Sequence, residues 1–162
     1  MRKLMILMTA AALIGGAAFA VQAATANGRT PLKCLDTVWR TTATSTSSTS
    51  FRTVPGFTDS PVAIYPIAIN VSALVSGAPV EFRILSTNVG GQTHASQPGV
   101  TRFVPGTGAN SFAYQWVERN QSAATHSNML RLQWRSPSGN TVHLLRGDMS
   151  IAYTTDTCMG SP

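Results

Sequence analysis

The sequence predicts an all-β protein, an antiparallel β-sandwich with a jelly roll of about eight to ten short strands as the expected topology. Three observations lead to this fold class. Helical periodicity is nearly absent after the N-terminal segment, strand-like alternation is strong toward the C-terminus, and Gly/Pro turns separate the short apolar runs. Of the 162 residues, 43% are hydrophobic and only 11% are charged. A coiled coil or long helical bundle needs far more Glu and Lys, and an acidic disordered chain is excluded as well.

The first 23 residues are predicted to be a signal peptide. They begin with a basic pair and continue with an apolar run over 4–19, which is too short for a comfortable membrane span. Small-residue cleavage sites of the A-x-A type follow at 18–20 and, less well matched, at 21–23. Residues 24–162 then form a single domain. We therefore expect a mature protein that is secreted, periplasmic or at the cell surface, with no membrane span.

Two cysteines bracket the mature chain. Cys34 lies near its start and Cys158 near its end, and in an oxidising compartment they allow one intramolecular pairing. Closing so long a loop is worth about 5 kcal/mol by chain entropy, an upper figure. The sequence has no C-x-x-C motif, and two cysteines with His94, His126 and His143 do not make a zinc signature. We expect a structural disulfide, and neither a metal nor another cofactor.

The expected strands follow one another from the mature N-terminus. The first two carry β-branched residues around Trp39 and Phe51. Pro66 interrupts the third and demotes it to an edge strand or a bulge. The fourth alternates through Phe82 and Ile84, and the fifth ends at a Pro-Gly turn. The runs that predict strands are 35–44, 49–54, 61–71, 80–85, 100–104, 112–116, 129–136, 141–146 and 149–154.

The strands of the C-terminal third alternate most regularly. Large residues at every second position face one side of a sheet, and small or polar residues face the other. Turn signals at 137–140 and 146–148 separate these strands, so we expect an antiparallel meander here. The residues predicted to share one interior are Phe112, Tyr114, Trp116, Leu130, Leu132, Trp134, Met149, Ile151 and Tyr153.

Two further segments each allow two interpretations. Nine of the ten residues in 41–50 are Ser or Thr, which is typical of a mobile loop but is also compatible with a polar edge strand. Arg146-Gly147-Asp148 is the cell-adhesion tripeptide. An adhesion role would need this tripeptide at an exposed loop tip, whereas the simpler interpretation is a tight turn between two strands.

No motif indicates catalysis. The sequence contains neither a G-x-S-x-G elbow nor an H-E-x-x-H pair, and its acidic residues are too far apart to form a paired site by spacing alone. We therefore expect no enzyme activity, although a Ser-His-Asp triad could still assemble from distant residues. The acidic residues are Asp36, Asp59, Glu81, Glu118, Asp148 and Asp156.

Charge patterning bears on the partner. Removing the signal takes two of the 12 basic residues and none of the six acidic ones, which leaves a formal charge of +4 without any Lys/Arg run. This pattern does not indicate nucleic-acid binding. Arg131, Gln133 and Arg135 share one face of an expected strand, where forked guanidinium donors could hold an anionic glycan or polymer. The alternative is a solvated outer face.

The segment from Leu130 to Tyr153 resembles the last strands of the C1q/TNF-like jelly rolls of bacterial and phage surface proteins. The similar residues are the strand LRLQWRS at 130–136, a hairpin with Gly139 and Val142, and the strand RGDMSIAY at 146–153. The resemblance implies a ten-strand sandwich, often a homotrimer, that binds or forms a structural head and has no catalytic residues. This chain lacks the collagen-like stalk of many members. Its Ser/Thr-rich tract and its prolines can blunt strand edges and so favour a monomer instead.

The functional expectation is an exported, non-catalytic β-sandwich that binds a protein or glycan, or that builds a surface assembly. The alternatives are a lectin-like carbohydrate-binding module and, less favoured, a small secreted hydrolase. The positions of Trp39, Trp116 and Trp134 distinguish the first two: buried tryptophans favour the first, and a coplanar exposed pair favours the lectin. A pocket that joins a His, an acid and a Ser would favour the hydrolase.

Overall fold

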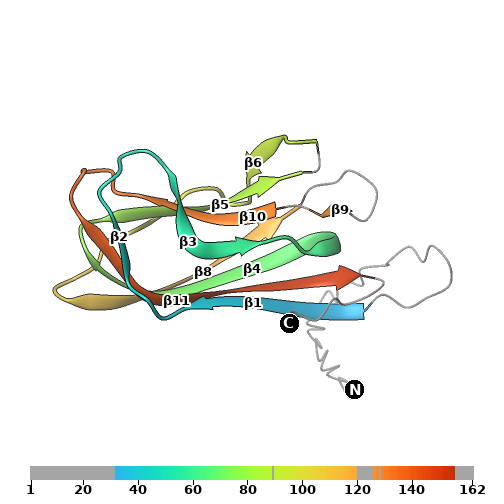
Figure 1. The fold of residues 1–162 in the computed structure, drawn as a ribbon, viewed down its shortest axis with the longest axis horizontal. Coiled ribbons are helices and arrows are strands. Elements are labelled where there is room, and N and C mark those ends of the chain that lie inside the picture. Colours follow the sequence, from blue (N-terminus) through green and yellow to red (C-terminus); the bar gives the residue numbers. More distant parts are fainter. Residues whose placement is uncertain (1–31, 89, 120–125, 128, 156–162) are drawn as a thin grey trace, which may run out of the picture.

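The computed structural model describes residues 32–88, 90–119, 126–127 and 129–155, and these form an all-β sandwich (Figure 1). The predicted fold class is confirmed. The predicted signal peptide, Cys158 and Asp156 lie outside the described residues. The strands are β1 (Leu32–Arg40), β2 (Thr44–Thr46), β3 (Arg52–Asp59), β4 (Val62–Gly77), β5 (Val80–Thr87), β6 (Thr93–Ala95), β7 (Thr101–Phe103), β8 (Ala109–Glu118), β9 (His126–Ser127), β10 (Met129–Arg135) and β11 (Val142–Thr155).

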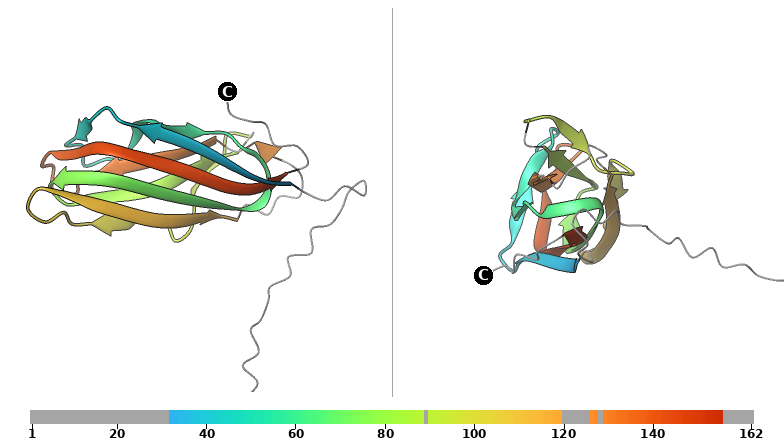
Figure 2. Two further views of the ribbon diagram at one scale, coloured as in Figure 1. Left: turned by 90° about the horizontal axis from the view of Figure 1, so that it is seen from below. Right: turned by 90° about the vertical axis from the view of Figure 1, so that its right-hand side faces the viewer.

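Two antiparallel sheets pack face to face, as the end-on view in Figure 2 shows. Sheet A has the order β1-β11-β4-β8, with β2 also on β11 and β9 also on β4. Sheet B has the order β3-β10-β5-β6, with β7 also on β5. The seven longer strands alternate between the sheets along the chain: β1, β4, β8 and β11 belong to sheet A, and β3, β5 and β10 to sheet B. This crossing back and forth is the strand order of a jelly roll.

The predicted C-terminal meander is wrong. β10 pairs with β3 and β5 in sheet B, whereas β11 pairs with β1, β2 and β4 in sheet A. The turn at 137–140 therefore carries the chain from one sheet to the other, and it does not close a hairpin. The expected turn at 146–148 is wrong too, because β11 runs through it without a break. Alternation shows which face of a strand is buried, but it does not show which strand lies alongside.

The Ser/Thr tract combines its two predicted alternatives, whereas Pro66 follows only one of its two. Within the Ser/Thr tract, Thr44–Thr46 is a short strand on β11 and the remainder is not strand. Pro66 lies in β4, which is the strand between β11 and β8 and not an edge strand. The register between β4 and β11 shifts opposite this proline, between Ala152 and Thr154. The bulge interpretation is therefore confirmed, since a bulge tolerates a missing N–H donor inside a sheet.

Aromatic side chains from both sheets fill the core. The Phe82 ring of sheet B stacks on Phe112 of sheet A with centroids 4.8 Å apart, and it also lies 6.5 Å from Trp134. Of the nine residues predicted to share one interior, all except Tyr114 are buried. Tyr114 is 37% exposed because β8 is an edge strand, where its ring packs edge-on against Trp116 at 4.8 Å. Interdigitation of this kind fixes how the sheets face one another.

Cys34 lies on the buried side of β1, opposite Tyr153 of β11. The described part of the chain contains no free cysteine. Because Cys158 is outside that part, its pairing with Cys34 stays a prediction. Among the described residues, none form a helix that is long and apolar enough to cross a membrane.

Candidate functional site

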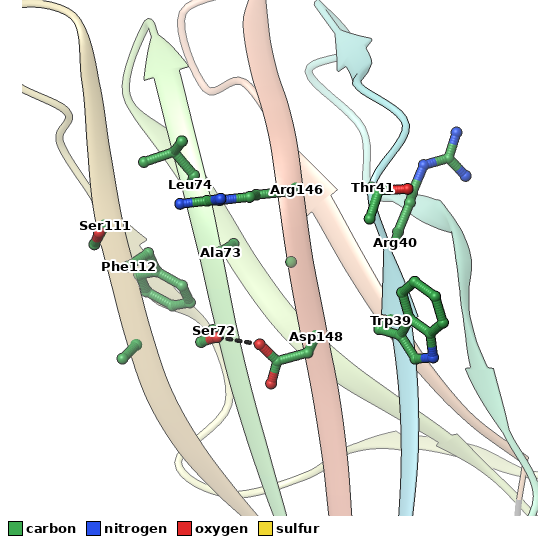
Figure 3. A pocket seen from close by; sticks show the side chains of 12 residues that line it. Trp39, Arg40, Thr41, Ser72, Ala73, Leu74, Ser111, Phe112, Arg146 and Asp148 are labelled. Atoms are coloured by element: carbon green, nitrogen blue, oxygen red, sulfur yellow. Dashed lines mark hydrogen bonds between the residues drawn. The ribbon is translucent and has the colours of Figure 1, made fainter.

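A pocket of about 380 Å³ lies on the outer face of sheet A, where β1, β11, β4 and β8 run side by side (Figure 3). Strand register builds it from a row of aligned residues. Trp39 of β1 pairs with Asp148 of β11, which pairs with Ser72 of β4, which pairs with Ala113 of β8. Arg146 lies two residues before Asp148 and faces the same way. We call this site the Trp39 pocket.

An interruption in the edge of sheet A opens the pocket. β1 leaves β11 at Arg40, and β2 joins β11 only from Thr44 onward. At the same level β11 carries a bulge between Leu144 and Arg146. A bulge bends its strand and re-aims the side chains beside it. The side chains of β4 and β8 that line the pocket include Ser72 and Ala113, and their small size leaves the space above these strands open.

Trp39 is the most exposed of the large apolar side chains that the structure describes. It is 73% exposed, whereas Trp116 and Trp134 are buried. The alternation of β1 explains this placement, because Cys34 and Val38 point toward the core and Trp39 has the opposite phase. Because Trp39 is exposed, the folded protein lacks one of the largest hydrophobic contributions to stability that a side chain can make.

The charged groups of the pocket differ in how they are held. Asp148 accepts a hydrogen bond from the Ser72 hydroxyl, which fixes the carboxylate (Figure 3). Arg40 donates to the carbonyl oxygens of Thr42 at 2.7 Å and Pro55 at 2.8 Å, so its guanidinium ties the end of β1 to β3. Arg146 extends over β4 toward Leu74 and has no hydrogen-bond or ion-pair partner in the structure as described. It is the cation of this pocket that remains available to a ligand.

Gly147 explains why the adhesion tripeptide can lie inside a strand. A Cβ at this position would approach the Ser72 carbonyl oxygen to 2.7 Å and Phe57 Cζ to 3.3 Å, so the Phe57 ring and the β4 backbone occupy the space of a side chain. Arg146 and Asp148 consequently project together from the outer face. The tripeptide is flanked by β1 and β4 and lacks the exposed loop tip that an adhesion role requires.

The predicted ligand residues Arg131, Gln133 and Arg135 do share one face, on β10 of sheet B. Their donors and acceptors are largely occupied by neighbours on β5. Arg131 Nη2 donates to Thr87 Oγ1 at 2.6 Å, and Arg135 binds Glu81 at 2.7 Å. Only Arg131 Nε is buried with no partner among the described residues. We call the surface formed by Arg131, Gln133 and Arg135 the sheet B arginine face.

Aromatic packing further closes the sheet B arginine face. Gln133 is only 9% exposed and accepts a hydrogen bond from Arg83 Nε at 2.9 Å. Arg83 and Arg135 lie over the Phe51 ring, with their Cζ atoms 4.1 and 4.6 Å from its centroid. Burial, and then the charge of Arg135, lower the pKa of Arg83. An anion would have to displace these mutual contacts before it could bind.

A third cluster contains the combination expected of a hydrolase. A pocket of about 300 Å³ between β6 and β8 holds His94, Ser96 and Glu118. His94 Nε2 is 2.8 Å from one oxygen of the buried Glu118 carboxylate, and Ser96 Oγ donates to the other at 2.8 Å. A catalytic triad needs the serine hydroxyl on the histidine. Here both groups bind the same carboxylate, so the arrangement stabilises a buried charge and does not activate Ser96.

No family model and no curated protein matches this chain. Seventeen chains of solved structures are similar, and three of them, all at low identity, are described next. A chain from the disulfide-linked pili of Bacillus endospore appendages has a TM-score of 0.46 at 14% identity, over 82% of this chain and 96% of that one. A chain of the infectious bursal disease virus Gx strain has 0.47 at 15%, over 77% of this chain and 33% of that one. A Desmodium yellow mottle tymovirus chain has 0.26 at 13%, over 100% of both.

This chain thus spans one third of the infectious bursal disease virus chain. Likeness this weak carries no function from one protein to another. The comparisons identify no C1q/TNF-like family, although the jelly-roll strand order is the fold that this resemblance implies.

Proposed function

We propose that this chain is an exported, non-catalytic β-sandwich that acts as a binding domain at or outside the cell surface, with the Trp39 pocket as its binding site. One observation carries the proposal: a tryptophan that is 73% exposed stands at the rim of a pocket that also holds a fixed carboxylate and an arginine with no partner among the described residues. Ligand sites combine an apolar surface with a few well-placed polar groups. Exposed apolar surface beside such groups is typical of an interaction site.

The tryptophan positions favour this function over the alternatives. Trp116 and Trp134 are buried and support the core, which leaves Trp39 without a coplanar partner. That arrangement does not fit a lectin built on a coplanar pair of tryptophans, although one exposed indole can still cover a single sugar ring. The hydrogen-bond pattern of Ser96 and Glu118 does not support the hydrolase. Export rests on the predicted signal peptide, and the homotrimer rests on the resemblance and on the small number of charges in the chain.

The experiment is a cell-association assay with the mature protein. Fluorescently labelled protein is added to intact cells of the source organism, and the retained fraction is measured by flow cytometry. We expect Trp39→Ala to lower retention by about tenfold, as for other central interface aromatics. Met129→Ala, which alters an exposed apolar residue of sheet B, is the matched control and should be retained like the wild type. Equal retention of Trp39→Ala and the wild type would overturn the proposed function.

A further inference from the structure

We propose that the Trp39 pocket binds a saccharide that carries a carboxylate, such as a uronic acid unit of a glycan. This inference rests on the proposed function, which places binding at this pocket, and it adds the chemical class of the ligand. Three features of the pocket have to be satisfied together by one molecule: an open aromatic face, an available guanidinium, and a carboxylate that accepts hydrogen bonds.

The aromatic face selects a partner with a flat apolar side. Trp39 projects from the outer face of β1, and β11 lies between it and the small side chains of β4 and β8 that also line the pocket. A ligand that covers the indole and reaches this floor therefore spans β11, where Arg146 and Asp148 lie. A pyranose ring presents such an apolar C–H face while its hydroxyls point outward, and an indole is well suited to cover it. A bare inorganic anion would leave the tryptophan uncovered.

Arg146 selects a negative group on that ligand. Its guanidinium reaches over the pocket and lacks a partner in the part of the chain that the structure describes. A guanidinium offers parallel N–H donors that match the two oxygens of a carboxylate. Arg40, the other cation of the pocket, is occupied by two backbone carbonyl oxygens. The anionic group is therefore expected at Arg146.

The Asp148 carboxylate favours a ligand that carries hydroxyl donors as well as its anionic group. The Ser72 hydroxyl holds this carboxylate on the same face as Arg146, two residues along β11. A fixed carboxylate repels a second anion unless a donor lies between them. Sugar hydroxyls supply that donor, whereas a fully ionised phosphate or a fatty acid does not. A sugar acid thus satisfies Trp39, Arg146 and Asp148 together.

The sheet B arginine face does not offer the same chemistry. Its guanidinium groups are engaged with Glu81, Gln133 and Thr87, and Phe51 lies against two of them. Binding there would exchange existing contacts for new ones and gain little. The Trp39 pocket needs no such exchange at Arg146. We therefore expect loss of the Arg146 guanidinium to weaken ligand binding, and loss of a guanidinium from the sheet B arginine face to leave it unchanged.

The test is isothermal titration of the mature protein with three probes: a short oligogalacturonate, a neutral cello-oligosaccharide and dextran sulfate. We expect the oligogalacturonate to bind best. Trp39→Ala and Arg146→Gln should each weaken its binding by about tenfold or more, as loss of a bidentate charge contact or a central aromatic does. The matched control is Arg102→Gln, which removes the same charge from an exposed position on sheet B and should bind like the wild type.

Each other outcome overturns the inference in a distinct way. Equal weakening by Arg102→Gln and Arg146→Gln would reduce binding to general charge attraction. Equal binding of the neutral probe, or tighter binding of dextran sulfate, would exclude the carboxylate as the recognised group. If none of the probes binds while Trp39→Ala still loses cell association, the inference falls and the proposed function stands. Thermal unfolding of each variant shows that it is folded, and Arg146→Lys, which keeps the charge without the fork, should bind with intermediate affinity.

Discussion

Two tryptophans of this chain differ mainly in the sheet face on which they lie. Trp134 is 1% exposed and stacks near Phe82, whereas Trp39 is 73% exposed. Trp134→Ala removes a buried ring and leaves a cavity, so it should lower the free energy of unfolding by about 3–5 kcal/mol. Trp39→Ala should change it by no more than about 0.5 kcal/mol. Chemical denaturation of the two variants measures both; similar midpoints would contradict the strand phases described here.

A second residue-scale prediction concerns Tyr153 at high pH. Its hydroxyl donates to Asp36 Oδ2 at 2.8 Å. Burial, this hydrogen bond, and the charges of Asp36 and Asp59 raise the pKa of Tyr153 from 10.0 to about 12. Between these values the folded chain keeps a proton that the unfolded chain has released, so stability present below pH 10 is lost as pH rises toward 12.

Tyr153→Phe removes this titration. The unfolding free energy of the variant should therefore fall less steeply than that of the wild type between pH 10 and 12. Denaturant melts at several pH values across the window give both slopes. Parallel curves would show that the Tyr153 hydroxyl does not contribute as described. Groups that titrate in both proteins cancel in the comparison.

At the residue scale, alternation in the sequence predicts burial well. It fails at Tyr114, because exposure there depends on β8 lying at the edge of its sheet, and strand order is not visible in the chain. The side-chain hydrogen bonds on the sheet B arginine face could not be predicted from the sequence either. Arg131, Gln133 and Arg135 are visible as one face, but their partners come from β5, which is about fifty residues away in the sequence for two of the hydrogen bonds.

At the scale of the element, β11 depends on a glycine. Gly147→Ala would place a methyl group 2.7 Å from the Ser72 carbonyl oxygen, which belongs to the backbone and cannot move aside cheaply. We expect a loss of about 1–3 kcal/mol in the free energy of unfolding. In Gly106→Ala the new methyl would meet only the Asn110 side chain, at 3.4 Å, so this control should lose much less. Equal losses in the two variants would contradict the close packing at β11.

The existence of most strands could be predicted from the sequence, but their pairing could not. The expected runs at 80–85 and 129–136 closely match β5 and β10. The turn predicted at 137–140 is present but joins two sheets instead of closing a hairpin. The turn predicted at 146–148 is wrong, because turn propensity is local and a Gly or Asp can also lie in a strand. At Gly147 the tertiary approach of Phe57 overrides that propensity.

At the scale of the whole molecule, the predicted disulfide would join the first described strand to the C-terminal tail. We predict that Cys34 and Cys158 are bonded in the exported protein. Thiol titration under denaturing, non-reducing conditions should find almost no free thiol. Reduction should then lower the unfolding free energy by up to about 5 kcal/mol. Two titratable thiols per chain would contradict the bond, and a reducible dimer on a gel would show that it links two chains.

The Trp39 pocket is likewise a property of the whole molecule. Its residues come from four strands, and it opens where β1 gives way to β2 opposite a bulge in β11. The Arg146-Gly147-Asp148 tripeptide is recognisable in the sequence, but whether Trp39 is buried or exposed is not. The sequence could not predict that these residues lie side by side, because register between distant strands is set by the assembled sheet.

The central claim is that a glycan that carries carboxylates binds on the outer face of sheet A. Amide and indole chemical shifts of the isotope-labelled mature protein, titrated with a short oligogalacturonate, test it most directly. We predict that the largest shifts fall at Trp39, Ser72, Arg146 and Asp148 and saturate together with one dissociation constant. Shifts that cluster instead around Gln133 on the sheet B arginine face, or no shifts at all, would contradict the claim.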